Sequence, residues 1–237
     1  MRKLFILLIL FYSSVGFSIS DLHLVVDSSL SLPVRKIIRE YAKEQSIIIT
    51  ADFSASKELL KSSEKGAHIV ISVHDKKSNS NLRGVNFASD RLYLCLARGS
   101  RVEKLISKGG NLNTILKIAK KHSTFIVPNL NSQIGAIIKD VMVKLKIDRY
   151  VEIGNFENLG YTAIRSGAFA ILPGSIATQY EGAGLEKLFE IPRNLYPKIQ
   201  YTVSIVDSRG IEQSRDFIRF LFLESVLLRG LGFYQGV

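Results

Sequence analysis

A length of 237 residues, a formal net charge of +11 and a single cysteine together exclude several classes of protein. Because Cys95 has no second cysteine to pair with, the fold is not held by internal disulfides. The lysines and arginines are spread along the sequence without an RNA-binding aromatic motif or a zinc finger, which argues against a nucleic-acid partner. We expect these basic residues to form a solvated face that suits an anionic membrane or an anionic ligand.

The amino-terminal segment has the pattern of an export signal. Arg2 and Lys3 precede an unbroken apolar run at 4–12, and small and polar residues then lead to Ser20. The nine residues of this run are too few to cross a bilayer, which takes about 20. We therefore predict that residues 1–20 are cleaved before Asp21, that the mature protein is periplasmic, and that its net charge is +9 because Arg2 and Lys3 are lost. A retained membrane anchor is the alternative.

Strands and helices alternate along nearly the whole mature chain. Short apolar runs predict strands at 22–26, 47–50, 69–73, 91–97, 124–127, 150–153, 168–172 and 200–206. Helical spacing of apolar residues predicts helices from Pro33 onward and at 57–63, 112–121, 132–146, 159–165, 211–223 and 224–229, with a polar loop at 75–83. The alternation favours an α/β protein with mostly parallel sheets, which bind ligands beyond the carboxyl ends of their strands.

Two serine-containing turns follow the first two predicted strands. They read Asp27-Ser28-Ser29 and Ser54-Ala55-Ser56, and each leads into a predicted helix. Hydroxyl and backbone N–H groups at a helix N-terminus are suited to binding an anion. Serine is also a common helix cap, so these turns are either ordinary caps or part of an anion site.

The sequence lacks the usual catalytic and metal-binding motifs. It has no Gly-x-Ser-x-Gly elbow, no Walker loop and no Gly-x-Gly-x-x-Gly after a strand. Its four histidines, His23, His68, His74 and His122, do not have the spacing of metal ligands. We therefore expect a binding protein and not an enzyme, with no cofactor and no metal site.

Four segments in order give the mature chain a resemblance to the molybdate-binding periplasmic proteins. "LHLVVDSSLS" and "ADFSASKELL" look like that family's first two strands with their serine turns. "FASDRLYLCLARGS" is similar to its crossing strand, and "YTVSIV" followed by "RDFIRFLFLESVLLRGLGFY" is similar to its return strand and closing helices. The resemblance implies the two-lobed α/β fold of type II periplasmic binding proteins. The first lobe would comprise 21–87 and 201–237, and the second lobe 88–200.

The resemblance also implies a site and partners. In that family a small oxyanion lies between the lobes and is held by neutral donors. Carried over by position, Ser29 and Ser56 would donate from the first lobe, and the backbone N–H groups of Ile134 and Leu159 from the second. The implied ligand is molybdate or tungstate, delivered by a monomeric protein to the membrane permease of an ABC transporter.

Three departures from the family pattern leave the ligand open. Pro173 stands where many members have a donor tyrosine, with Ser175 nearby as a substitute. Asp27 brings a carboxylate close to Ser29, and Lys57 beside Ser56 would neutralise it or reach the ligand. The segment "KGAHIVIS" is shorter than its counterpart. The alternatives are another small anion or an organic solute on the same fold, or an exported interaction protein without a pocket that uses its basic surface.

Overall fold

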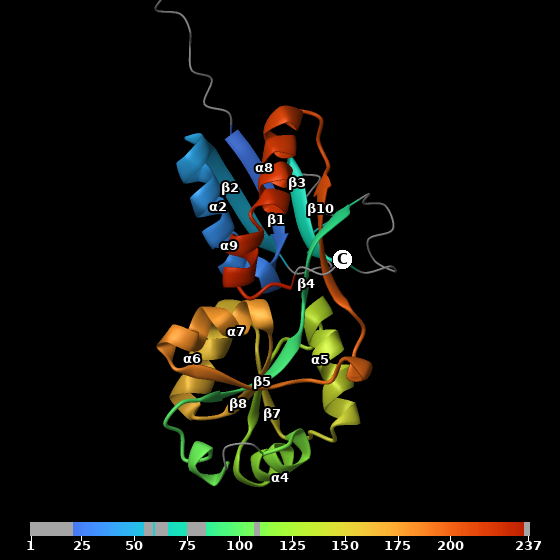
Figure 1. Cartoon of the computed structure of the whole chain (residues 1–237). Helices are drawn as coiled ribbons and strands as arrows, with labels where there is room; N and C mark the ends of the chain where they lie inside the picture. The colour runs from blue at the N-terminus through green and yellow to red at the C-terminus, as the bar shows by residue number, and fades with distance from the viewer. Residues whose placement is uncertain (1–20, 55–58, 60–65, 75–83, 107–109, 235–237) are drawn as a thin grey trace, which may run out of the picture.

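The computed structural model describes residues 21–54, 59, 66–74, 84–106 and 110–234. The predicted signal, Ser56, Lys57, most of the predicted helix at 57–63 and the predicted loop at 75–83 lie outside these ranges. The described chain forms two lobes stacked end to end, each built on its own five-stranded sheet with helices against it (Figure 1). No helix among the described residues is long and apolar enough to cross a membrane.

The first lobe has the strand order β2-β1-β3-β10-β4. Strand β1 (Asp21–Asp27) lies parallel to both β2 (Ile48–Ser54) and β3 (Ile69–Val73). Strand β10 (Ile199–Ile205) runs antiparallel to β3 and to β4 (Val85–Asp90). The short 3₁₀ helix η1 (Ser28–Leu30) leads into α2 (Ser31–Gln45), and α8 (Ile211–Leu223) and α9 (Ser225–Gly230) close the lobe.

The second lobe repeats this arrangement with the order β7-β6-β8-β5-β9. Strand β6 (Phe125–Pro128) is parallel to β7 (Tyr150–Ile153) and β8 (Phe169–Pro173), whereas β5 (Leu92–Ala97) is antiparallel to β8 and to β9 (Leu185–Glu190). Its longer helices are α4 (Leu112–His122), α5 (Gln133–Lys144) and α6 (Phe156–Ser166). The shorter ones are α7 (Gly174–Tyr180), η2 (Glu103–Leu105) and η3 (Glu181–Ala183), and η4 (Arg193–Leu195) lies on the return to the first lobe.

The predicted α/β fold class is confirmed, and each sheet is mixed in direction. Both sheets contain two parallel and two antiparallel pairings, because one strand in each sheet runs against the other four. These strands are β10 in the first lobe and β5 in the second, and each is the strand by which the chain enters its lobe from the other one. The outward crossing is the single residue Arg91 between β4 and β5, and the return crossing is 191–198. The expected lobe boundaries at 87/88 and 200/201 therefore fall inside β4 and β10.

Two strands and one α-helix of the fold were not predicted from the sequence. Strand β4 has the sequence VNFASD and β9 has LEKLFE, and neither shows a clean apolar run. Helix α7 starts directly after Pro173 and has 7 residues, too few to reveal a helical period. All three lie beside a crossing between the lobes, where partners from distant segments stabilise elements with weak local signals.

Aromatic rings fill the interior of both lobes. In the first, Tyr41 of α2 packs against Phe217 and Phe220 of α8, with ring centroids 5.1 Å and 5.0 Å apart. In the second, Phe125 of β6 stacks on Phe169 of β8 at 5.7 Å, and both are fully buried. Burial of such rings contributes about 2–3 kcal/mol each, so these pairs anchor the helices and strands that carry the site.

Replacing Phe169 with alanine is expected to destabilise the protein by about 3–5 kcal/mol, because it removes a buried ring and leaves a cavity against Phe125. Urea unfolding followed by circular dichroism measures this loss. The control Val143→Ala changes a side chain that is 71% exposed on α5, so it should alter stability by less than about 0.5 kcal/mol. Similar losses in both variants would contradict the packing described.

Candidate functional site

The candidate site lies at the seam between the lobes, where strands from both sheets end. Strand β1 ends at Asp27 in the first lobe, and β8 ends at Pro173 in the second. Beyond these ends, η1 and α2 pack against α6 and α7 (Figure 1). Arg35 Nε of α2 lies 3.2 Å from Glu157 Oε1 of α6, so an ion pair also links the two faces. Because α/β proteins bind ligands at the carboxyl ends of parallel strands, the seam is the candidate ligand site.

The Ser29 turn already holds an anionic oxygen. The backbone N–H of Ser29 donates to Asp27 Oδ1 at 2.9 Å, and its hydroxyl donates to the same oxygen at 2.6 Å. Both residues are about 1% exposed. The two donors of Ser29 therefore converge on one point, as the predicted oxyanion site requires, but the protein's own carboxylate occupies that point.

The first turn of α5 supplies donors from the second lobe. Ser132 caps the helix by accepting a hydrogen bond from the backbone N–H of Gly135 at 3.0 Å, which leaves the N–H of Ile134 within the first turn. Ile134 is fully buried, and its role as a backbone donor to a ligand stays a prediction. The neighbouring Gln133 was not predicted as a site residue. Its side-chain amide nitrogen and oxygen are both buried without a hydrogen-bond partner among the described residues.

Leu159 differs from the prediction, which placed it at the start of a helix. Helix α6 begins three residues earlier, at Phe156, because Asn155 is its N-cap and accepts a hydrogen bond from Glu157 N at 2.7 Å. Leu159 is thus the fourth residue of α6, and it is fully buried. Its N–H lies past the unpaired donors of the first turn, so the residues that can offer a backbone N–H there are nearer Phe156.

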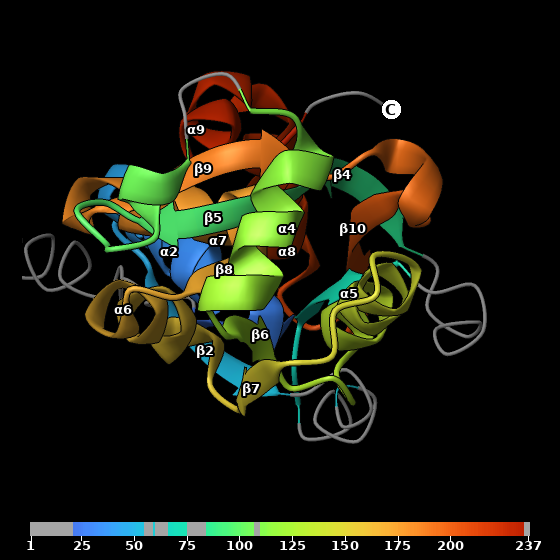
Figure 2. The same cartoon turned by 90° about the horizontal axis from the view of Figure 1, so that it is seen from below.

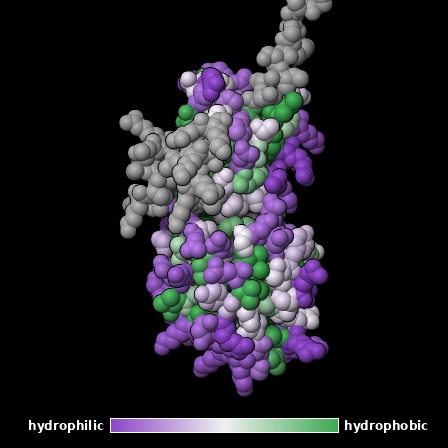
Figure 3. All heavy atoms as spheres, turned by 180° about the vertical axis from the view of Figure 1, so that it is seen from behind, coloured by the Kyte–Doolittle hydropathy of each residue, from purple (hydrophilic) through white to green (hydrophobic). Residues whose placement is uncertain are grey.

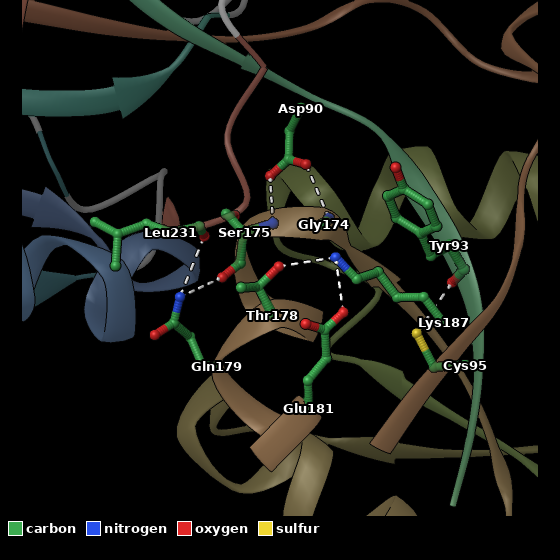
Figure 4. Close-up of polar contacts among 10 residues, drawn as sticks. All are labelled: Asp90, Tyr93, Cys95, Gly174, Ser175, Thr178, Gln179, Glu181, Lys187 and Leu231. Carbon is green, nitrogen blue, oxygen red and sulfur yellow. Dashed lines mark hydrogen bonds and ion pairs between the residues drawn. The ribbon is translucent and has the colours of Figure 1, made fainter. Parts of the chain in front are cut away.

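The start of α7 is bound by a second internal carboxylate. Asp90 is fully buried and accepts hydrogen bonds from the backbone N–H of Gly174 at 2.8 Å and of Ser175 at 3.2 Å (Figure 4). The hydroxyl of Tyr201 donates to the same carboxylate at 3.0 Å. Pro173, at the position of the family's tyrosine, is the N-cap of α7 and makes no side-chain hydrogen bond. Ser175, the expected substitute, donates its N–H to Asp90 and is fully buried.

Burial shifts the titration of this cluster. Loss of solvent raises the pKa of the Asp90 carboxyl from its ordinary value to about 6, although the hydrogen bonds that it accepts oppose the rise. The pKa of Tyr201 is also raised, first by burial and then by the negative charge of Asp90, and Asp27 adds to the same effect. Both carboxylates thus lie within electrostatic reach of one phenol, although they accept hydrogen bonds from turns on different lobes.

The described residues contain no group of histidine, cysteine, aspartate and glutamate side chains that could hold a metal ion. His23 Nε2 pairs with Asp52 at 3.1 Å, and the N–H of His23 donates to His68. Cys95 is fully buried in β5, and burial raises the pKa of its thiol, so it is suited to packing and not to nucleophilic chemistry.

Comparisons with known proteins give a fold and no family. No protein-family model and no curated protein matches the chain. Among solved structures, the periplasmic molybdate-binding protein of Azotobacter vinelandii is 14% identical with a TM-score of 0.71, covering 91% of this chain and 100% of that one. A substrate-binding domain assigned to a molybdenum ABC transporter from Clostridium difficile is 18% identical with a TM-score of 0.66, covering 92% and 99%.

Regulatory domains share the same architecture. The bromide-bound regulatory domain of HypT from Salmonella typhimurium, a LysR-type transcriptional regulator, is 15% identical with a TM-score of 0.64 and covers 92% of this chain and 100% of that one. The chain therefore has the type II periplasmic-binding-protein fold, which these solute-binding proteins and regulatory domains have in common. At such identities the likeness establishes the fold and leaves the ligand to be argued from the site.

The raised pKa of Asp90 predicts how an Asp90→Asn variant depends on pH. The native carboxyl keeps its proton up to about pH 6, whereas the unfolded one loses it near pH 4, so stability from this group is complete below about pH 4 and lost as the pH rises through 6. Asparagine does not titrate. The variant should therefore gain about 3 kcal/mol relative to the wild type between about pH 4 and pH 7, measured by urea unfolding. A difference that stays constant with pH would contradict the assignment.

Gly135 is expected to be essential for the geometry of α5. A β-carbon built there overlaps the backbone carbonyl oxygen of Asn129, which cannot move aside as a flexible side chain could. Gly135→Ala should therefore cost about 2–3 kcal/mol in thermal or urea unfolding. Gly154→Ala is the matched control, because a β-carbon at Gly154 meets no atom within 4 Å. Equal stability of the two variants would contradict the close packing of Gly135 against the backbone of Asn129 at the start of α5.

Proposed function

We propose that the protein is an exported substrate-binding protein that captures a small oxyanion between its lobes and passes it to the permease of an ABC transporter. The observation that carries the proposal is the convergence of the Ser29 N–H and hydroxyl on a single anionic oxygen at 2.9 Å and 2.6 Å. A desolvated oxyanion needs such converging neutral donors, and the first turn of α5 at Ile134 supplies another from the opposite lobe.

Molybdate and tungstate are the first candidates for the ligand. They are fully ionised tetrahedral anions, so a cradle of donors satisfies them without an acceptor, whereas a protonated phosphate would leave its proton unpaired. Solved proteins of this fold with titles that name molybdate or molybdenum support the choice. Export is supported by the sequence of residues 1–20, with its basic start, apolar run and small residues before Asp21.

Asp27 acts in this proposal as an internal competitor of the ligand. Its carboxylate occupies the Ser29 donors, so an entering oxyanion must displace it and would be repelled by it at short range. Closure of the lobes on the ligand then supplies the second set of donors. A protein of this design binds its oxyanion more weakly than one whose serine turn is open.

A second candidate is an organic solute that carries a hydrogen-bond donor of its own. Gln133 favours it, because its buried amide offers an unpaired acceptor oxygen as well as an unpaired donor at the start of α5. Asp27 favours it too, because a carboxylate in the cleft suits a ligand with an N–H or O–H group. An amino acid is a representative of this class.

Replacing Asp27 with alanine is expected to strengthen oxyanion binding by about tenfold or more, because it frees both Ser29 donors and removes a repelling charge. Isothermal titration of the mature protein with molybdate, tungstate, sulfate and phosphate measures the change. Asp52→Ala is the matched control, since it removes the same charge from the same lobe at a side chain that is 70% exposed.

The possible results separate the candidates. Molybdate or tungstate binding that tightens in Asp27→Ala and is unchanged in Asp52→Ala supports the oxyanion proposal. Binding heat that is measured only with amino acids, and that disappears in Asp27→Ala, supports the organic solute as the ligand. No binding of either class, with both variants folded, would overturn the proposal that the seam captures a small solute.

A further inference from the structure

The second lobe contains a cavity of about 690 Å³ at the end of its sheet that faces away from the seam. Its walls come from the segment after β5, the end of α4, the starts of β6 and β7, and the end of α6. Ile126 and Val151 place it near the amino ends of β6 and β7, whereas the seam lies at the carboxyl ends of these strands. Figure 2 views the second lobe from below, on the side away from the first lobe. Its volume is in the range of small-molecule sites, and it is separate from the seam between the lobes.

The cavity is lined by cationic side chains without a carboxylate. Four arginines from three separate segments line it, together with His122: Arg98, Arg101, Arg149 and Arg165. No described aspartate or glutamate lies in its wall. The nearby Glu103 accepts a hydrogen bond from the backbone N–H of Gly99, so its charge is already engaged by the loop. The four arginines around this one cavity create a local positive potential that attracts anions.

Several other arginines of the described chain are neutralised by a carboxylate. Arg35, Arg91, Arg209 and Arg215 each pair with a carboxylate at 2.6–3.2 Å. In contrast, no ion pair links an arginine of the cavity to any described carboxylate. A position at the carboxyl end of a helix accounts for Arg165 and His122, but Arg98, Arg101 and Arg149 lie outside helices. Helix capping therefore does not explain the cluster.

The floor of the cavity is apolar. Val102, Ile126 and Ala168 contribute to it and are 7%, 4% and 5% exposed. The space-filling view shows strongly hydrophilic residues gathered around this end of the second lobe (Figure 3). A basic rim over an apolar floor suits a ligand with an anionic group at one side and an organic body at the other.

We propose that this cavity binds an organic phosphate. The planar guanidinium groups match phosphate oxygens in paired hydrogen bonds, and the apolar floor accommodates the organic part. A soluble phosphate ester and the headgroup of an anionic phospholipid offer the same chemistry. The site does not depend on the proposed function of the cleft, because the two share no residue and lie at opposite ends of the second sheet.

Isothermal titration of the mature protein with phenyl phosphate tests the site, with inorganic phosphate and phenol as probes of its two halves. Flotation with phosphatidylcholine vesicles, with and without phosphatidylglycerol, tests the lipid source. The double variant Arg149→Gln/Arg165→Gln should weaken phenyl phosphate or vesicle binding by about tenfold or more. Arg39→Gln/Arg219→Gln is the matched control, because it removes the same charge from exposed arginines of α2 and α8 in the other lobe.

Each outcome decides the proposal. Binding of phenyl phosphate supports a soluble phosphate ester if it is tighter than that of inorganic phosphate and is lost only in the cavity variant. Binding confined to phosphatidylglycerol vesicles, with the same dependence on the variants, supports a lipid headgroup. Absence of both, or equal loss in the two double variants, would overturn the site. If the cavity variant unfolds in a thermal melt, Arg98→Gln/Arg101→Gln replaces it, since both arginines are exposed on the loop after β5.

Discussion

The buried carboxylate of Asp90 is the interaction on which the relation of the two lobes depends. It ends the last strand of the first lobe before the crossing, and it accepts hydrogen bonds from Gly174 and Ser175 of the second lobe. Tyr201 on the returning strand binds the same carboxylate, and the guanidinium of Arg193 donates to the Asp90 carbonyl oxygen at 3.1 Å. The two crossings are thus tied to each other and to α7 at one residue. A buried charge with this many donors is stable only while all of them stay in place, so Asp90 fixes where the lobes meet.

The Ser29 turn has the same arrangement, in which donors at the start of a helix bind a buried carboxylate of the protein itself. Helix starts in this fold are anion sites by construction, and here two of them are bound to the protein's own carboxylates. Asp90 is deeply integrated into the crossings, which makes it a structural anion. Asp27 accepts both hydrogen bonds of Ser29 in a short turn, and the proposed function makes it the carboxylate that a ligand displaces. In the proposed function, the oxyanion therefore competes with Asp27 for the Ser29 donors, whereas Asp90 stays in place and holds the two lobes together.

The sequence predicted the long elements and the fold class, because apolar runs and helical stripes are local signals. Resemblance over four segments also pointed to Ser29 and Ile134 as ligand donors, which stays a prediction. It could not predict that Ser29 would be bound to Asp27, since that depends on the conformation of the turn. The start of α6 was predicted three residues late, at Leu159 instead of Phe156. The reason is that Asn155, a polar residue before an apolar stripe, was not interpreted as the helix cap. The roles of Asp90 and Gln133 and the basic cavity were not predicted. In each case the burial and the contacts depend on how distant parts of the chain pack together.

The central claim is that one anion is held jointly by both lobes at the seam. Amide ¹H–¹⁵N spectra of the mature Asp27→Ala protein, recorded during titration with molybdate, test it most directly. If both lobes hold the anion, the Ser29 and Ile134 amide signals shift together with a single dissociation constant, while those of Arg149 and Arg165 do not follow that curve. Shifts confined to the cavity residues, or unchanged signals at Ser29 and Ile134 at saturating molybdate, would contradict it.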